Sequence, residues 1–216
     1  VADRITVLRD GRSVGTLDCH EGVVQEDEII RRMVDRDMES RYPKRNPKIG
    51  DVIFDVENWS AYHPQHSERQ VVKNVSMQVR AGEIVGISGL MGAGRTEFAM
   101  SIFGRSWGRN ISGKVRLHGK DVDVSDVHRA IKAGLAYVTE DRKHLGLILG
   151  EDIRKNISLA HLGGVSSRGV IDDIDEMKVA QDFRTRMRIR SHNVYQETGK
   201  LSGGNQQKVV LSKWLF

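Results

Sequence analysis

A glycine-rich loop between an apolar segment and a helical one constrains the fold of this chain more than any other feature. Residues 83–88, EIVGIS, are apolar and rich in β-branched side chains, which is typical of a buried strand in a mostly parallel sheet. The loop GLMGAGRT follows at 89–96, and we expect a helix over 96–103. Because strands that alternate with helices around such a turn form layers, the sequence predicts a three-layer α/β domain.

The loop has the composition of a phosphate-binding site. It matches the pattern G-x-x-x-x-G-K-[S/T] at every position except the lysine. Glycines have no Cβ, so successive backbone N–H groups can approach phosphate oxygens, and the positive end of the following helix adds to the attraction. Thr96 would offer its hydroxyl to the Mg²⁺ that bridges the outer phosphates. The alternative is that the glycines only terminate the strand. The residues assigned to nucleotide binding are Gly89, Leu90, Met91, Gly92, Ala93, Gly94, Arg95, Thr96 and Glu97.

Arg95 stands where the pattern has lysine. A lysine ammonium is a compact point charge that fits between two phosphates, whereas a guanidinium is a wide planar fork that needs more room. The exchange keeps the charge but predicts weakened or altered nucleotide binding and slow phosphoryl transfer at this site.

A second glycine motif, LSGGNQQ at 201–207, opens a segment with helical spacing. Its serine hydroxyl and bare backbone N–H groups at a helix N-terminus suit a second phosphate clamp. With this motif the chain resembles the ABC ATPase family, whose signature closes on the ATP held by the other ATPase domain. The residues assigned to the signature are Leu201, Ser202, Gly203, Gly204, Asn205 and Gln206.

Between the two motifs lies the sequence EDRK at 140–143. Most ABC proteins have a glutamine here that touches Mg²⁺ and the attacking water, so Glu140 is a candidate for this position, and no other residue of the chain is assigned to catalysis. Together with GRTE and SGGNQQK, this variant resembles the second ATPase half of monosaccharide importers of the ribose, galactose and xylose type. A carboxylate and two cations in a loop could also be a surface ion cluster.

The N-terminal region is separate in composition from the rest. Alternating residues around Asp10-Gly11 predict a hairpin, and QEDEIIRRMVDRDM at 25–38 predicts a helix. Residues 1–40 resemble the end of a first ATPase half, residues 41–50 have the composition of a linker, and residues 51–216 resemble a second nucleotide-binding domain. The resemblance implies a P-loop NTPase fold of the ABC ATPase type, with an antiparallel β subdomain and a helical subdomain.

Further elements follow from local patterns. Residues 52–56 and the alternating Val71, Val75, Met77 and Val79 predict two strands, and residues 113–120 predict a hairpin. A short helix is expected over 127–134, a second buried strand over 135–139, and mostly helices from 152 onwards, with glycine-rich breaks at 163–169 and 202–204.

The family's strand that ends in Asp-Glu, and the histidine switch after it, have no counterpart in this sequence. The pair Asp172-Asp173 precedes the signature and is better explained as a capped helix start. We therefore expect a domain that is truncated at its C-terminus after the signature helix. On this expectation the chain is inactive alone, while its full-length parent hydrolyses ATP.

Two other residue groups have weaker assignments. Trp59 or Tyr62 lies where the family often stacks an aromatic ring on adenine, although packing explains both residues equally well. Four histidines lack metal-ligand spacing and are assigned no metal, namely His63, His66, His161 and His192.

The composition leaves the class of ligand open but favours one cellular compartment. The net charge of +5 suits phosphate ligands, nucleic acid or an anionic membrane alike, and the single Cys19 and the absence of a secretion signal favour the cytosol. The resemblance implies an energy-coupling ATPase on the cytoplasmic face of the inner membrane. Its implied partners are another ATPase half or a second copy, transmembrane permease subunits and, indirectly, a periplasmic sugar-binding protein, but not nucleic acid. The alternatives are a non-catalytic module that holds ATP to join two ATPase domains and, remotely, an ABC ATPase of DNA repair.

Overall fold

The structure is a computed structural model of the chain, and it describes residues 2–9, 11–20, 22–34 and 45–216. Internal contacts divide the chain into two compact units, Val1–Pro47 and Lys48–Phe216. This division falls inside the segment 41–50 whose composition indicates a linker. Residues 41–44 of that segment lie outside the described part of the chain.

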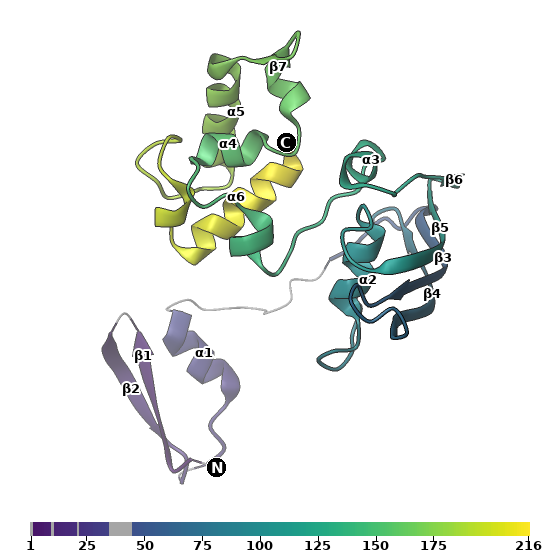
Figure 1. The fold of residues 1–216 in the computed structure, drawn as a ribbon. Helices are drawn as coiled ribbons and strands as arrows, with labels where there is room; N and C mark the ends of the chain where they lie inside the picture. The colour runs from purple at the N-terminus through teal and green to yellow at the C-terminus, as the bar shows by residue number, and fades with distance from the viewer. Residues whose placement is uncertain (1, 10, 21, 35–44) are drawn as a thin grey trace. The chain divides into compact units, whose positions relative to one another are not determined.

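The first unit contains a hairpin and a helix (Figure 1). Strand β1, Arg4–Arg9, pairs antiparallel with β2, Arg12–Asp18, so the predicted hairpin is confirmed. Gly11 in the turn has a φ of +77°, a conformation that glycine adopts without strain, and Asp10 lies outside the described residues. Helix α1, Glu26–Val34, confirms the helix predicted over 25–38 as far as residue 34, because residues 35–38 are not described.

The second unit contains a four-stranded antiparallel sheet of order β4-β3-β5-β6. Its strands are β3, Val52–Tyr62, β4, Gln70–Arg80, β5, Arg109–Leu117, and β6, Lys120–Asp121. In β4 the apolar Val75, Met77 and Val79 are half-buried and alternate with exposed residues, as predicted. The predicted hairpin within 113–120 is also confirmed, since β5 and β6 meet at His118 and Gly119, which both have positive φ as a tight turn requires.

One face of this sheet packs against α2, Arg95–Ile102, the helix predicted after the glycine loop. Phe98 and Ile102 of α2 share a buried cluster with Val56 and Trp59 of β3 and with residues of the neighbouring strands. This cluster is the first of two apolar cores. It fixes α2, and therefore the loop that precedes it, relative to the sheet.

The predicted parallel strands are wrong for this structure. Residues 83–88 and 135–139 belong to no strand, and every paired strand in the described residues is antiparallel. A strand needs partners for its backbone N–H and C=O groups, and none of the described residues pairs with either segment. Their side chains are correspondingly uncovered, with Ile84 78% exposed and Val138 45% exposed.

The rest of the second unit is mostly helical, as predicted. Its helices are α3, Val127–Lys132, α4, Ile153–Ser158, α5, Asp173–Arg186, and α6, Gly203–Leu215. Shorter elements connect them: η1, a π turn at Arg142–Gly146, η2, Leu162–Val165, β7, Ser166–Ser167, β8, Val170–Ile171, and η3, Thr198–Lys200. The interpretation of Asp172 as a cap is confirmed, because its side chain accepts hydrogen bonds from the backbone N–H groups of Ile174 and Asp175.

A second apolar core holds α4, α5 and α6 together. Ile153 and Ile157 of α4, Phe183 of α5, and Val209 and Val210 of α6 are all buried in it. The signature helix α6 is thereby fixed by its apolar face, while its N-terminal turn remains accessible.

Candidate nucleotide-binding site and signature

The glycine loop adopts a conformation that its sequence makes possible. Gly92 and Gly94 have φ values of +80° and +87°, in the left-handed region that glycine enters at little cost. The backbone N–H of Ala93 donates to the carbonyl of Leu90 at 3.1 Å, and that of Phe98 donates to the carbonyl of Gly94 at 2.8 Å, the first bond of α2. The loop therefore leads directly into the N-terminus of α2, which is the arrangement that binds phosphate elsewhere.

Two predicted site residues come together beside this loop. Thr96 Oγ1 donates a hydrogen bond to Glu140 Oε1 at 2.9 Å, and the Tyr137 hydroxyl donates to Glu140 Oε2 at 3.3 Å. The backbone N–H of Glu140 itself, followed by the Thr96 hydroxyl, holds the pKa of the Glu140 carboxyl below its ordinary value. Burial, followed by the charge on Glu140, raises the pKa of Tyr137.

This pair fits a magnesium ion bound with a nucleotide. Hydroxyl and carboxylate oxygens are the ligands that Mg²⁺ prefers, and the low pKa of Glu140 keeps its carboxyl ionised. Thr96 and Glu140 are the residues of the described chain that would hold the ion. No group of three or more His, Cys, Asp or Glu side chains in the described residues could hold a metal by itself.

Arg95 is the first residue of α2 and is exposed. Its Cδ and Nε lie 3.7 and 3.8 Å from the point where a Cβ added to Gly89 would be. The guanidinium stem therefore runs along the first glycine of the loop.

The signature forms the N-terminal turn of α6. Ser202 is the N-cap residue, its Oγ accepts a hydrogen bond from Asn205 Nδ2 at 2.9 Å, and Asn205 Oδ1 accepts from the backbone N–H of Arg190 at 3.0 Å. Because the Ser202 oxygen is already held as an acceptor, its hydrogen is free to point at an anion. Ser202 and Gly204 are exposed, and the space around Gly204 is open.

Gln206 differs from the rest of the signature because its side chain is directed inward. It is buried, and its Nε2 faces the carbonyl oxygens of Leu201, Thr198 and Gly199 at 3.2, 3.4 and 3.4 Å. Its Oε1 accepts a hydrogen bond from Arg142 Nε at 3.1 Å. Gln206 therefore holds the turn that precedes Ser202 and is not available to a ligand.

Residue patterns assigned no individual role to Arg142 or Lys213, and in the structure both tie η1 to α6. Lys213 Nζ donates to the carbonyl of Gly146 at 2.6 Å, and burial lowers the pKa of Lys213. A pattern of residue types shows which positions are charged, but it does not show a hydrogen bond that joins residues 64 or 67 positions apart.

Trp59 is not an adenine-stacking residue in this structure. It is 1% exposed, and its Nε1 donates to Ser101 Oγ at 2.9 Å inside the first core. No face of the indole is therefore open to a base. Tyr62, at the end of β3, is half-buried and remains the candidate.

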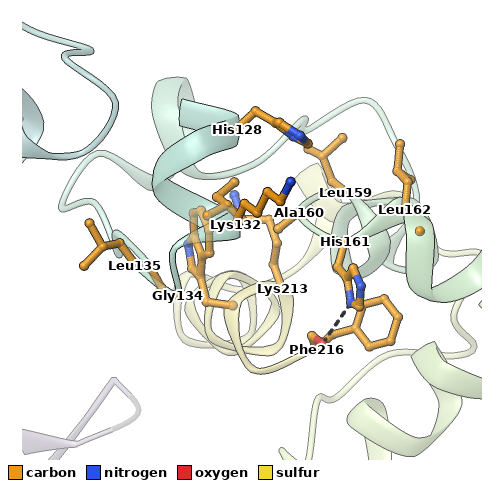
Figure 2. Close-up of a pocket in the computed structure, with 14 residues that line it drawn as sticks. His128, Lys132, Gly134, Leu135, Leu159, Ala160, His161, Leu162, Lys213 and Phe216 are labelled. Carbon is orange, nitrogen blue, oxygen red and sulfur yellow. Dashed lines mark hydrogen bonds between the residues drawn. The ribbon is translucent and has the colours of Figure 1, made fainter. Parts of the chain in front are cut away.

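A large pocket of about 720 Å³ lies away from these motifs (Figure 2). Its walls come from α3, the turn around η2 and the end of α6, and they include His128, His161, Lys213 and Phe216. It contains no residue of the glycine loop or of the signature, so its size does not make it the nucleotide site.

Within the described residues, no helix is both long and apolar enough to cross a bilayer.

Sequence comparisons relate the chain to known proteins over a range that includes both glycine motifs. The profile of the ABC transporter family matches residues 72–216. The L-arabinose transport ATP-binding protein AraG of Geobacillus stearothermophilus is 58% identical over 216 residues, which are 100% of this chain and 42% of that protein. The ribose import ATP-binding protein RbsA of Bacillus subtilis is 41% identical over 215 residues, or 100% of this chain and 41% of that protein. The chain thus spans about two-fifths of the length of these relatives.

Solved structures share the fold. A dimeric ATP-binding cassette in a post-hydrolysis state with ADP and Pi aligns with a TM-score of 0.60 at 20% identity, over 76% of this chain and 69% of that one. The ADP-bound conformation of another cassette aligns with a TM-score of 0.57 at 20% identity, over 76% and 64%. At this identity the likeness concerns the fold alone. Since the family profile covers most of the chain, including both glycine motifs, the chain belongs to the ABC transporter family.

Proposed function

We propose that this chain is the nucleotide-binding part of an ABC sugar importer, in which residues 89–97 bind Mg-ATP and residues 201–205 contact the ATP of another ATPase domain. The observation that carries the proposal is the presence of both glycine motifs, each at the start of a helix, on one chain. Monosaccharide import is supported by the relatives described above, an L-arabinose transport ATP-binding protein and a ribose import ATP-binding protein.

The proposed work of the signature is electrostatic. The Ser202 hydroxyl and the backbone N–H groups of Gly203 and Gly204 are donors at the positive end of α6. Donors of this kind stabilise charge that develops on a transferred phosphoryl group, and losing one costs about 2.7–4 kcal/mol in characterised enzymes. The signature would therefore act on hydrolysis at the partner's site.

The proposed work of the glycine loop is to hold a nucleotide. Bound Mg²⁺ would neutralise the outer phosphates, while the Thr96 hydroxyl and the Glu140 carboxylate orient it. Arg95 in place of lysine favours a second candidate for this site, namely a non-catalytic one in which ATP joins the two ATPase domains. Both functions are compatible if the partner's site is the one that hydrolyses.

The remaining parts of the proposal concern the whole protein. Residues 1–40 would close a first ATPase half, and residues 51–216 would form the larger part of a second. The full-length protein would bind two permease subunits at the cytoplasmic face of the membrane and hydrolyse ATP, and a periplasmic sugar-binding protein would deliver the substrate.

The test is steady-state ATP hydrolysis by the full-length protein with its membrane subunits. Ser202→Arg should abolish most of the activity, because it fills the signature that serves the complete site. Arg95→Ala should leave a substantial part of it. Equal damage by the two changes would show that the sites are not divided in this way.

A further inference from the structure

Gln206 has an amide whose orientation is determined by its neighbours. Three backbone carbonyls, those of Thr198, Gly199 and Leu201, surround its Nε2, so the NH₂ group must face them. Its oxygen then points the opposite way and, since the side chain is buried, it needs a donor. The donor is Arg142 Nε, at 3.1 Å.

Arg142 reaches α6 from a turn that is held at both ends by hydrogen bonds. It is the first residue of η1, which is capped by Asp141, and the Asp141 carboxylate accepts from both the backbone N–H and the ring of His144. At the other end of the same turn, the Gly146 carbonyl accepts from Lys213. Two side-chain hydrogen bonds, one near each end of α6, therefore fix η1 against the signature helix.

The guanidinium also covers the first glycine of the signature. A Cβ added to Gly203 would lie 2.9 Å from Arg142 Nη2, closer than carbon normally approaches nitrogen. A side chain at position 203 would therefore displace the end of the Arg142 side chain.

We propose that Arg142 is a positioning residue for the signature, an inference that rests on the proposed function of residues 201–205. Its guanidinium holds the amide of Gln206 in one orientation, Gln206 holds the carbonyls of the turn at 198–201, and that turn sets the position of Ser202 and of the N–H groups that follow. Without Arg142 the Gln206 oxygen is buried with no donor, and the amide loses the contact that orients it.

The first arm of the test needs no activity. Amide hydrogen exchange is measured at Gly199, Leu201 and Gln206, whose N–H groups donate at 2.8, 3.1 and 2.9 Å, in the chain and in Arg142→Ala. We expect exchange at these amides to be about tenfold faster in the variant, because a hydrogen bond to a charged group is lost. Arg142→Lys should restore part of the protection, and Lys143→Ala, which removes the neighbouring exposed cation, should change nothing. Unchanged exchange in Arg142→Ala would overturn the proposal.

The second arm measures ATP hydrolysis by the full-length protein with its membrane subunits. Arg142→Ala should lower kcat about tenfold, leave KM within about twofold and leave nucleotide binding at residues 89–97 unchanged, since the signature acts on the partner's phosphoryl group. A rise in KM with kcat unchanged, or weaker binding at the chain's own loop, would overturn the positioning role. Faster exchange combined with no hydrolysis by the unmodified protein would instead contradict the proposed function and leave the positioning of the turn intact.

Discussion

Thr96 in the glycine loop and Glu140 in the EDRK segment are joined by a hydrogen bond of 2.9 Å, although 44 residues separate them. The sequence made each a candidate on separate grounds, Thr96 as a magnesium ligand and Glu140 at the position where most ABC proteins have a glutamine. Their contact supports a single site. It also joins the glycine loop to the segment whose Arg142 contacts α6.

The contact has a measurable electrostatic consequence. The low pKa of Glu140 is caused first by the backbone N–H of Glu140 and next by the Thr96 hydroxyl. Thr96→Val should therefore raise the pKa of Glu140 towards its ordinary 4.5, as followed by a carbon-detected NMR titration of the carboxyl. Thr185→Val, on α5, is the control and should leave this pKa unchanged. The same result for both variants would mean that the hydroxyl does not bond to Glu140.

The replacement of lysine by Arg95 predicts a gain of function. Arg95→Lys should tighten the binding of a fluorescent ATP analogue by the chain, because an ammonium fits between phosphates where the fork does not. Arg186→Lys makes the same exchange on α5 and should have no effect. Unchanged or weaker binding by Arg95→Lys would show that the guanidinium is an adapted ligand.

Trp59 and Ser101 predict a stability effect inside the first core. The indole N–H donates to Ser101 Oγ at 2.9 Å, and that hydroxyl donates to the Phe98 carbonyl at 2.8 Å, with both residues buried. Ser101→Ala should lower the free energy of unfolding by about 1–3 kcal/mol, since the N–H is left without an acceptor.

Urea unfolding of a double-mutant cycle with Trp59→Phe checks this reason. Phenylalanine has no N–H to leave unpaired, so Ser101→Ala should cost less in its presence. An equal cost in both backgrounds would assign the effect to packing.

Lys213 predicts a pH dependence. Burial lowers the pKa of Lys213 in the folded chain below the ordinary 10.5. Between the pKa of the folded chain and 10.5, the unfolded chain therefore binds the proton more strongly than the folded one. The cost of the buried charge is fully present below the folded pKa and disappears as the pH rises towards 10.5. The free energy of unfolding of the chain, relative to that of Lys213→Met, should therefore increase as the pH rises towards 10.5. A constant or falling difference in urea unfolding would contradict the lowered pKa.

Local patterns predicted most of the elements but not their long-range partners. The hairpins, α2 and the Asp172 cap follow from residues close in sequence, so turn and capping chemistry was enough to find them. The segments 83–88 and 135–139 have the composition of buried strands, but composition reports burial propensity and cannot supply a hydrogen-bonding neighbour. The prediction that Trp59 stacks on adenine was wrong for a related reason. An aromatic residue at the expected distance from the loop can pack in a hydrophobic core as readily as it can stack on a nucleotide base.

Some parts of the candidate site could be predicted from local sequence patterns, and other parts could not. The glycine loop and the signature were found because backbone conformation and helix starts are encoded locally. Arg142, Gln206 and Lys213 act through hydrogen bonds across 64 and 67 residues, and their roles required the structure.

Nucleotide binding by the glycine loop is the central claim, and a matched pair of variants tests it. Gly92 and Gly119 have φ values of +80° and +75°, and no atom lies within 4 Å of a Cβ added to either, so aspartate meets no steric obstacle at either position and carries a similar backbone strain at both. Gly92→Asp puts a carboxylate in the loop, and Gly119→Asp puts one in the β5–β6 turn.

The measurement is Mg-ATP binding by the chain and by both variants, with released phosphate followed in parallel. We predict that the chain and Gly119→Asp bind with equal affinity, that Gly92→Asp binds about a hundredfold more weakly because like charges meet at the phosphates, and that none of the three turns ATP over. Absence of binding by the unmodified chain, or equal binding by all three proteins, would contradict the claim.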